Sequence, residues 1–231
     1  TIDPINDPPL LNDEPNENKT IYEDDESENF SLPSGSDDAD NNATNLTFNI
    51  ISEPDDGLFT LTDNSSGLYS FDPNGNFNYL SKDSLEQVFL TYNIFDEEDY
   101  SINTGEITFN IIGENDETIV SNIINENTFY ENDPLITDQS ITQPQDNDIE
   151  DYFTFEIATD PDLGIAGIIN DTYTFDTNNQ FDYLSEGDQR IISFTYRSLD
   201  QNNIPSSNNG NITLTITGED DPTTVLDSIY T

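Results

Sequence analysis

Cysteine, histidine, methionine and tryptophan are all absent from this chain of 231 residues. Without cysteine there is no disulfide and no thiol chemistry. Without histidine or cysteine the preferred ligands of zinc and copper are missing, and nucleophilic triads of the usual form cannot be built. The ligands that remain are oxygens, which suit calcium.

Basic residues are scarce as well: Lys and Arg total 4 against 49 Asp and Glu, for a formal net charge of −45. Nucleic-acid binding depends on Lys and Arg that neutralise phosphates, so this composition excludes nucleic acid as a natural partner. It also disfavours anionic membrane surfaces. The sequence has no apolar run of 18 residues and therefore no segment that we expect to span a membrane.

The chain begins without Met and without a signal peptide, and we expect it to be a piece of a longer polypeptide. Its charge and its mean hydropathy of −0.66 are typical of disordered chains. However, aromatic residues make up 11% of the sequence, and Phe, Tyr and Ile alternate with polar residues in many segments. This alternation predicts folded domains built from β-strands.

One pattern is repeated along the chain. Residues 88–117 (VFLTYNIFDEEDYSINTGEITFNIIGENDE) consist of a strand, an acidic loop, a second strand and an acidic linker. The pattern returns over 192–222, and its linker also opens the chain. The linker residues Asp7, Asp116 and Asp221 are separated by 109 and 105 residues, which predicts repeats of domain size. We therefore expect the end of a preceding linker at 1–8, a first repeat at 9–116, a second repeat at 117–222, and the start of a further repeat or a terminal strand at 223–231.

Each repeat contains about seven short strand signals separated by Asn, Asp, Gly and Ser. They include a hairpin, 69–72 with 77–80, around Pro73-Asn74-Gly75-Asn76. The fold class predicted is all-β, with two tandem antiparallel β-sandwiches of about seven strands each. The predicted core comprises Phe48, Ile50, Phe71, Tyr92 and Phe109 in the first repeat, and Phe155, Ile157, Phe175, Tyr196 and Leu214 in the second. Tyr79 and Tyr183 have strand spacing too, and we assign them to the core rather than to a sugar-binding platform.

Acidic residues recur at matched positions one repeat apart. The pairs are Glu23 with Glu131, Asp38 with Asp146, Asp40 with Asp148, Asp96 with Asp200, and Asp116 with Asp221. For any single Asp in a loop, exposure to solvent explains the residue as well as metal ligation does. For the set, calcium ligation is the better explanation, because clustered carboxylates repel one another and calcium takes six to eight oxygen ligands. An ion shared by successive repeats would remove this repulsion and fix the angle between them.

The order of these motifs carries a family resemblance. A Glu in the first strand, Asp-x-Asp before the second, Asp after the sixth and Asn-Asp-x-Pro in the linker resemble the cadherin-like repeats of bacterial surface proteins. Residues 184–188 (LSEGD), 194–196 (FTY) and 217–222 (TGEDDP) are similar to VCBS-type tandem repeats of RTX adhesins. The resemblance covers both repeats and implies calcium-binding, cadherin-like β-sandwiches that extend an adhesin from a cell surface.

The resemblance also implies three sets of metal ligands. The set between the repeats is Glu23, Glu86, Asn115, Asp116, Asp146, Asp148 and Asp200. The set upstream of the first repeat is Asp3, Asn6, Asp7, Asp38, Asp40 and Asp96. The set downstream of the second repeat is Glu131, Glu186, Asp220 and Asp221. The expected cofactor is Ca²⁺, and the expected partners are calcium ions and neighbouring repeats of the same polypeptide or identical subunits.

The function expected is an extracellular structural or adhesion module, a spacer in a large surface adhesin, with no enzymatic activity. The alternative is a subunit of an extracellular filament or surface layer that adds an edge strand to its neighbour. A ligand-binding adhesion tip is a third class, although no motif marks a pocket. Asn-x-Ser/Thr sequons leave glycosylation open; they begin at Asn18, Asn29, Asn42, Asn45, Asn64, Asn170 and Asn211.

Overall fold

The protein is described by a computed structural model that covers residues 5–11, 15–33, 36–39 and 46–222. The described residues form β-strands, turns and bends, without a helix, and the predicted all-β fold is confirmed. The chain divides into two compact units. The first comprises residues 1–116 together with 147–150, and the second comprises residues 117–146 and 151–231.

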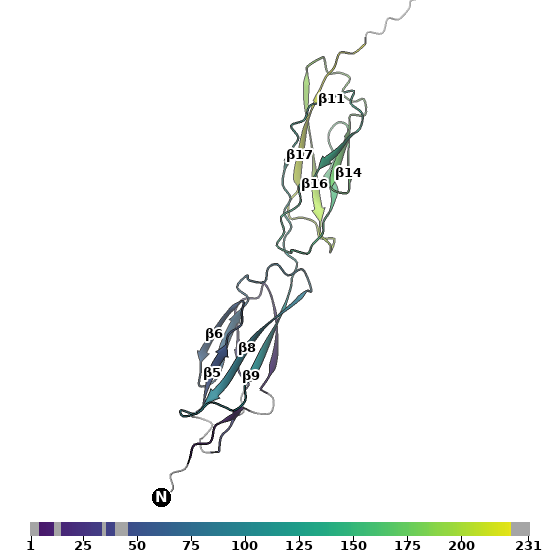
Figure 1. Ribbon diagram of the computed structural model, residues 1–231. Coiled ribbons are helices and arrows are strands. Elements are labelled where there is room, and N and C mark those ends of the chain that lie inside the picture. The colour runs from purple at the N-terminus through teal and green to yellow at the C-terminus, as the bar shows by residue number, and fades with distance from the viewer. Residues whose placement is uncertain (1–4, 12–14, 34–35, 40–45, 223–231) are drawn as a thin grey trace, which may run out of the picture. The chain divides into compact units, whose positions relative to one another are not determined.

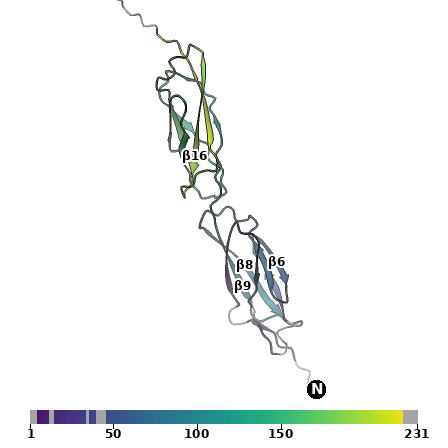
Figure 2. The same cartoon turned by 180° about the vertical axis from the view of Figure 1, so that it is seen from behind.

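The first unit is a sandwich of a four-stranded and a three-stranded sheet, with orders β2-β9-β8-β5 and β3-β7-β6. A short pair, β1 with β4, adds to it. Its strands are β1 Leu10–Leu11, β2 Glu17–Tyr22, β3 Glu28–Ser31, β4 Ser36–Asp37, β5 Thr47–Ser52, β6 Leu58–Asp63, β7 Leu68–Asp72, β8 Leu85–Phe95 and β9 Gly105–Ile112. In Figures 1 and 2 the long strands β8 and β9 lie side by side, with β6 in the other layer.

The second unit repeats this plan. Its larger sheet has the order β10-β17-β16-β13, with β11 also paired to β17, and its smaller sheet has the order β12-β15-β14. The strands are β10 Ile123–Ile124, β11 Phe129–Tyr130, β12 Ile136–Ser140, β13 Thr154–Thr159, β14 Ile165–Ile169, β15 Thr172–Asp176, β16 Gln189–Leu199 and β17 Gly210–Thr217. In the first unit β2 pairs in parallel with β9, and in the second unit β10 and β11 pair in parallel with β17; the other strand pairs are antiparallel.

The cores follow from the alternation in the long strands. In β8, Val88, Leu90, Tyr92 and Ile94 are buried because successive side chains point to opposite faces of a sheet. The predicted core residues Phe71, Phe109, Phe175, Tyr196 and Leu214 are buried too, whereas Phe48, Ile50, Phe155 and Ile157 are partly buried and pack against these clusters. Each unit therefore has its own apolar core between its two sheets.

The predicted strands at 77–80 and 181–184 are wrong. After β7 the chain makes consecutive turns instead, in which Asn76 N–H donates to Pro73 O and Leu80 N–H donates to Phe77 O. The second unit has the same turn, from Leu184 N–H to Phe181 O. Short apolar runs do not distinguish a strand from a turn that buries one aromatic ring. Phe77 and Phe181 are fully buried in this way.

The core assignment of two tyrosines is also wrong. Tyr79 is 37% exposed and Tyr183 is 62% exposed. Both follow the buried Phe within these turns, where the period-2 rule of a strand does not hold. Their rings therefore lie at the surface.

Candidate metal centre

Glu23 follows the first long strand, β2, and its side chain is only 2% exposed. Its N–H donates to Ile112 O (3.0 Å), which extends the parallel pairing of β2 with β9 by one residue. One carboxylate oxygen, Oε1, accepts the Glu114 N–H at 2.7 Å. The other, Oε2, is buried and receives no hydrogen bond. Few buried polar atoms are left without a partner in proteins, so this oxygen requires an explanation.

Two further carboxylates act on Glu23 from within the same unit. Asp148, 3% exposed, accepts the Asp116 N–H on Oδ2 at 3.1 Å. This contact joins the linker to the segment 147–150. Burial, together with the charges of Asp116, Asp148 and Asp24, raises the pKa of Glu23 from 4.5 to about 7, although the Glu114 N–H opposes the shift. Glu23 therefore lies among other negative charges, with one buried carboxylate oxygen that receives no hydrogen bond.

The second unit repeats the geometry of Glu23 at Glu131. Glu131 is 2% exposed, and its Oε1 accepts the Glu219 N–H at 2.6 Å. Its N–H donates to Thr217 O (3.0 Å), and its Oε2 is buried without a hydrogen bond. The local fold therefore positions this carboxylate in the same way twice.

Asp96 and Asp200 occupy a second pair of matched positions, directly after β8 and β16. Asp96 is 2% exposed, and its Oδ1 accepts the N–H groups of Glu98 and Asp99. Its Oδ2 accepts Asn6 Nδ2 at 3.0 Å, and the same amide contacts Asp99 Oδ2 at 3.3 Å. Burial pushes the pKa of Asp96 upward, but the hydrogen bonds from Asp99, Asn6 and Glu98 outweigh it, so the pKa lies below its usual value. Asn6, Asp96 and Asp99 thus form one group.

Asp200 is 3% exposed and is bound by main-chain groups of the segment that follows β16. Its Oδ1 accepts the N–H groups of Asn202 and Ile204, each at 2.8 Å. Its Oδ2 is buried without a hydrogen bond. Three matched acids, Glu23, Glu131 and Asp200, therefore each hold one buried oxygen that receives no hydrogen bond.

Several predicted ligands make other contacts. Asp146 accepts Thr118 Oγ1 at 2.6 Å, and Asn115 Nδ2 donates to Asp116 O at 3.0 Å. Glu86 accepts a short hydrogen bond from the Tyr79 hydroxyl at the start of β8. That hydrogen bond is the main cause that raises the pKa of Tyr79 to about 12, and the charge of Glu23 contributes, so Glu86 and Glu23 act on the same hydroxyl group.

The remaining predicted ligands differ in their exposure. Asp38 is partly buried; Asp7, Glu186, Asp220 and Asp221 are exposed. Asp3 and Asp40 lie outside the described residues. Across residues 5–11, 15–33, 36–39 and 46–222, no group of three or more Asp or Glu side chains is already spaced as a metal site.

Sequence reasoning missed the donors that hold the carboxylates. The N–H groups of Glu114 and Glu219 support Glu23 and Glu131, and Asp99 joins Asn6 and Asp96. Main-chain donors carry no residue-type signal. Their only trace in the sequence is the repeated Gly-Glu at 113–114 and 218–219.

Comparisons with solved structures identify the fold. The chain is similar to human CDH23 EC21-23 (TM-score 0.58, 12% identity, 91% of this chain and 70% of that chain). It is also similar to protocadherin gamma B2 extracellular cadherin domains 1-5 (0.56, 16%, 94% and 40%) and to human protocadherin-24 EC1-2 (0.52, 16%, 94% and 100%). The chain therefore spans less than half of the gamma B2 fragment. These likenesses establish tandem cadherin-like sandwiches.

The other comparisons gave no match: no family model and no curated protein matches this chain. The described residues also contain no helix long and apolar enough to cross a membrane.

Proposed function

We propose that this chain is a calcium-rigidified extracellular module, a non-enzymatic spacer in a large surface adhesin. The observation that carries the proposal is the buried carboxylate of Glu23, which is 2% exposed and has one oxygen without a hydrogen bond. Asp116 and Asp148 add negative charge to the same cluster. A buried carboxylate is costly unless it is paired with a cation or bound to a metal.

The ion pairs Lys19–Glu17, Arg190–Asp162 and Arg197–Glu156 do not involve Glu23, Glu131 or Asp200. A divalent cation with a preference for oxygen would neutralise the buried carboxylate of Glu23. Calcium fits because it accepts six to eight oxygen ligands in flexible geometry, whereas magnesium demands a tight octahedral shell.

Glu23, Asp116 and Asp148 are the side chains that would hold the ion, and Asn115, whose Nδ2 donates to Asp116 O, is next to Asp116 in the chain. Glu131 and Asp200 are the matched candidates in the second unit. Bound calcium would supply positive charge. Because segment 147–150 belongs to the compact first unit but is continuous in sequence with the second repeat, that charge would restrain the connection between the repeats. This restraint is the mechanical role proposed.

Two observations support the proposal that the module is extracellular. The solved structures that share this fold are extracellular cadherin domains, and the motif order resembles the VCBS-type repeats of bacterial RTX adhesins. Extracellular calcium modules bind their ion with Kd of about 10⁻⁴ to 10⁻³ M, which matches external calcium concentrations. The assignment to RTX adhesins rests on the sequence motifs alone.

Thermal unfolding with and without calcium tests the proposal. An ion that binds only the folded state at ten times its Kd adds about 1.4 kcal/mol of stability per site. We expect millimolar calcium to raise the Tm of the chelated protein, and equal magnesium to raise it much less. Identical melting curves in calcium and in chelator would contradict the proposed function. Electron microscopy in calcium should show single particles, and polymers would favour the filament subunit instead.

A further inference from the structure

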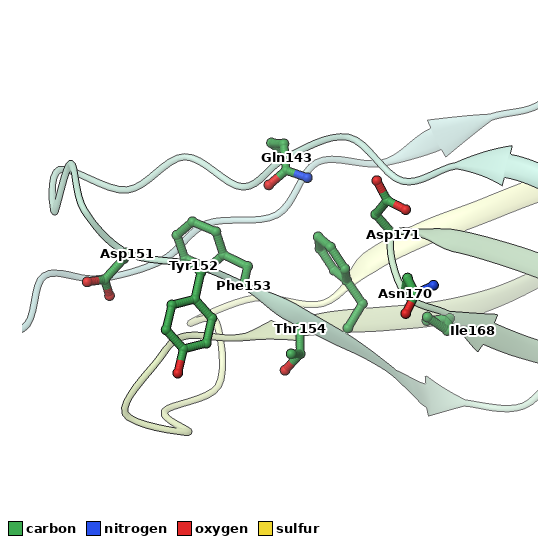
Figure 3. A pocket seen from close by; sticks show the side chains of 9 residues that line it. Gln143, Asp151, Tyr152, Phe153, Thr154, Ile168, Asn170 and Asp171 are labelled. Carbon is green, nitrogen blue, oxygen red and sulfur yellow. The ribbon is translucent and has the colours of Figure 1, made fainter.

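The second unit contains an open groove with a volume of about 750 Å³ on one edge of its sandwich. Tyr152, Phe153 and Phe155 contribute aromatic rings to its lining, and Gln143, Asn170 and Asp171 contribute polar groups. Figure 3 shows Asp151 and Tyr152 at one end and Ile168, Asn170 and Asp171 at the other. The Tyr152 side chain is strongly exposed (65%). Aromatic surface is thus open to solvent between two carboxylates.

The groove lies between edge strands of the two sheets. β13 ends the larger sheet and β14 ends the smaller one, among the described residues. Phe155 on β13 lies opposite Ser198 on β16. Ser198 directs its own backbone away from β13: its N–H donates to Ser206 Oγ (3.3 Å), and its C=O accepts the Ser206 N–H (2.9 Å). Directly opposed residues of an antiparallel pair either exchange both hydrogen bonds or neither. The backbone N–H and C=O of Phe155 therefore face outward, along the groove.

In the first unit, the strand edge that corresponds to the groove is covered by a turn. Phe48 is the residue matched to Phe155, and its N–H donates to Asn64 O at 2.8 Å. Asn64 belongs to the four-residue turn 64–67 between β6 and β7, whereas the corresponding turn of the second unit has only residues 170–171. At the end of the longer turn, Gly67 lies so close to the Phe48 ring that a Cβ there would be 2.8 Å from it. Shortening the turn therefore exposes a strand edge that the first unit covers.

Charge indicates what can occupy the groove. Asp171 is exposed at one end of the groove, whereas Asp151 at the other end accepts a short hydrogen bond from Gln201. The whole chain carries a formal charge of −45 with only 4 basic residues, so a second copy would bring the same charge and would be repelled. A peptide with alternating basic residues brings positive charge to Asp171, pairs its main chain with an exposed strand edge, and places its cations or their aliphatic stems against the aromatic rings.

We propose that this groove binds an extended basic segment of a different protein, which adds to the outer edge of β13 next to Phe155. β13, Thr154–Thr159, spans roughly 20 Å, enough for about six residues of an added strand. The first unit should lack this site.

The test measures binding of a fluorescein-labelled alternating Lys-Val peptide by anisotropy, with millimolar calcium and physiological salt. The decisive variant replaces residues 170–171 by the sequence of 64–67, Asn-Ser-Ser-Gly, which should close the groove and weaken binding at least tenfold. Asp182→Asn removes one exposed charge of the same unit outside the groove and should change the affinity less than twofold. The same peptide N-methylated on alternate residues keeps its charge but cannot pair as a strand, and it should not bind.

Equal binding by the closed-groove variant, or by the N-methylated peptide, would show that the acidic surface attracts any basic chain, and would overturn the proposal. If the replacement prevents folding, as judged by circular dichroism, Tyr152→Ser decides, since this exposed ring can be removed without touching the core. It should weaken binding at least fivefold, and unchanged affinity would reject the site. Amide hydrogen exchange should in addition slow at Phe155 when the peptide is bound.

Discussion

Tyr92 on β8 lies directly opposite Gly105 on β9, and its ring occupies the space that a side chain at Gly105 would need. A Cβ at Gly105 would be only 2.4 Å from the ring. The second unit has the same arrangement, with Gly210 opposite Tyr196, again at 2.4 Å. The two hydroxyl groups donate to Pro15 O and Ser121 O, at 2.8 and 2.7 Å. This pair ties the long strands to the segment just before β2 in the first unit and just before β10 in the second.

Gly105→Ala should destabilise the first unit because the Tyr92 ring has to move. Overpacking of this kind costs about 1 to 3 kcal/mol. The measurement is urea unfolding, and Glu106→Ala, one residue further along the same strand with an exposed side chain, is the control. Gly210→Ala should have the same effect in the second unit. A change below about 0.5 kcal/mol in both glycine variants would contradict the packing described here.

Tyr92 also predicts a pH dependence. Burial, with a smaller effect from the charge of Glu17, raises the pKa of Tyr92 from 10 to about 12 in the folded protein. A raised pKa means that the neutral ring stabilises the fold fully below pH 10, and that this contribution is lost as the pH rises towards 12. The difference in unfolding free energy between the parent and Tyr92→Phe should therefore shrink over that interval. A difference that stays constant from pH 9 to pH 12 would contradict the shift.

Substitutions at Asp148 test whether calcium restrains the connection between the repeats. Asp148→Asn keeps an oxygen but removes a charge, so calcium affinity should fall while both sandwiches stay folded. Replacement of Asp146 and Asp148 together by Ala should abolish the site. Small-angle scattering in calcium should then show a broader distribution of shapes than the parent gives, and chelator should produce the same change in the parent. A double variant with the scattering profile of the parent would mean that calcium does not restrain the connection.

The strands and the two-repeat plan could be predicted because they depend on local patterns. The alternation in β8 and β16 identifies the buried faces, including Tyr92 and Tyr196. The turns at 77–80 and 181–184 could not be predicted, since one buried aromatic ring in a series of turns has the same letters as a short strand. The role of Gly105 and Gly210 could not be predicted either. Each is needed because the ring of a residue distant in the sequence lies over it and leaves no space for a side chain.

The sequence indicated which acidic residues belong to the candidate site, but it indicated less well which groups they contact. Glu23, Glu131, Asp96, Asp148 and Asp200 recur in the sequence, and all five are buried. The contact of Glu86 with Tyr79 could not be predicted, because it depends on a turn that the pattern does not describe. The open groove of the second unit was missed for a related reason. A turn two residues shorter at 170–171 changes which strand edge is covered, and composition does not report this.

Direct titration of calcium into the chelated protein by calorimetry tests the central claim that buried carboxylates hold calcium. The comparison uses Glu23→Gln, which keeps the shape of a 2% exposed side chain but removes its charge, and Glu26→Gln, which removes an exposed charge three residues away. We predict saturable binding to the parent and to Glu26→Gln with Kd of about 10⁻⁴ to 10⁻³ M, and loss of at least one binding event in Glu23→Gln. Absence of saturable binding to the parent, or identical titrations of all three proteins, would contradict the account.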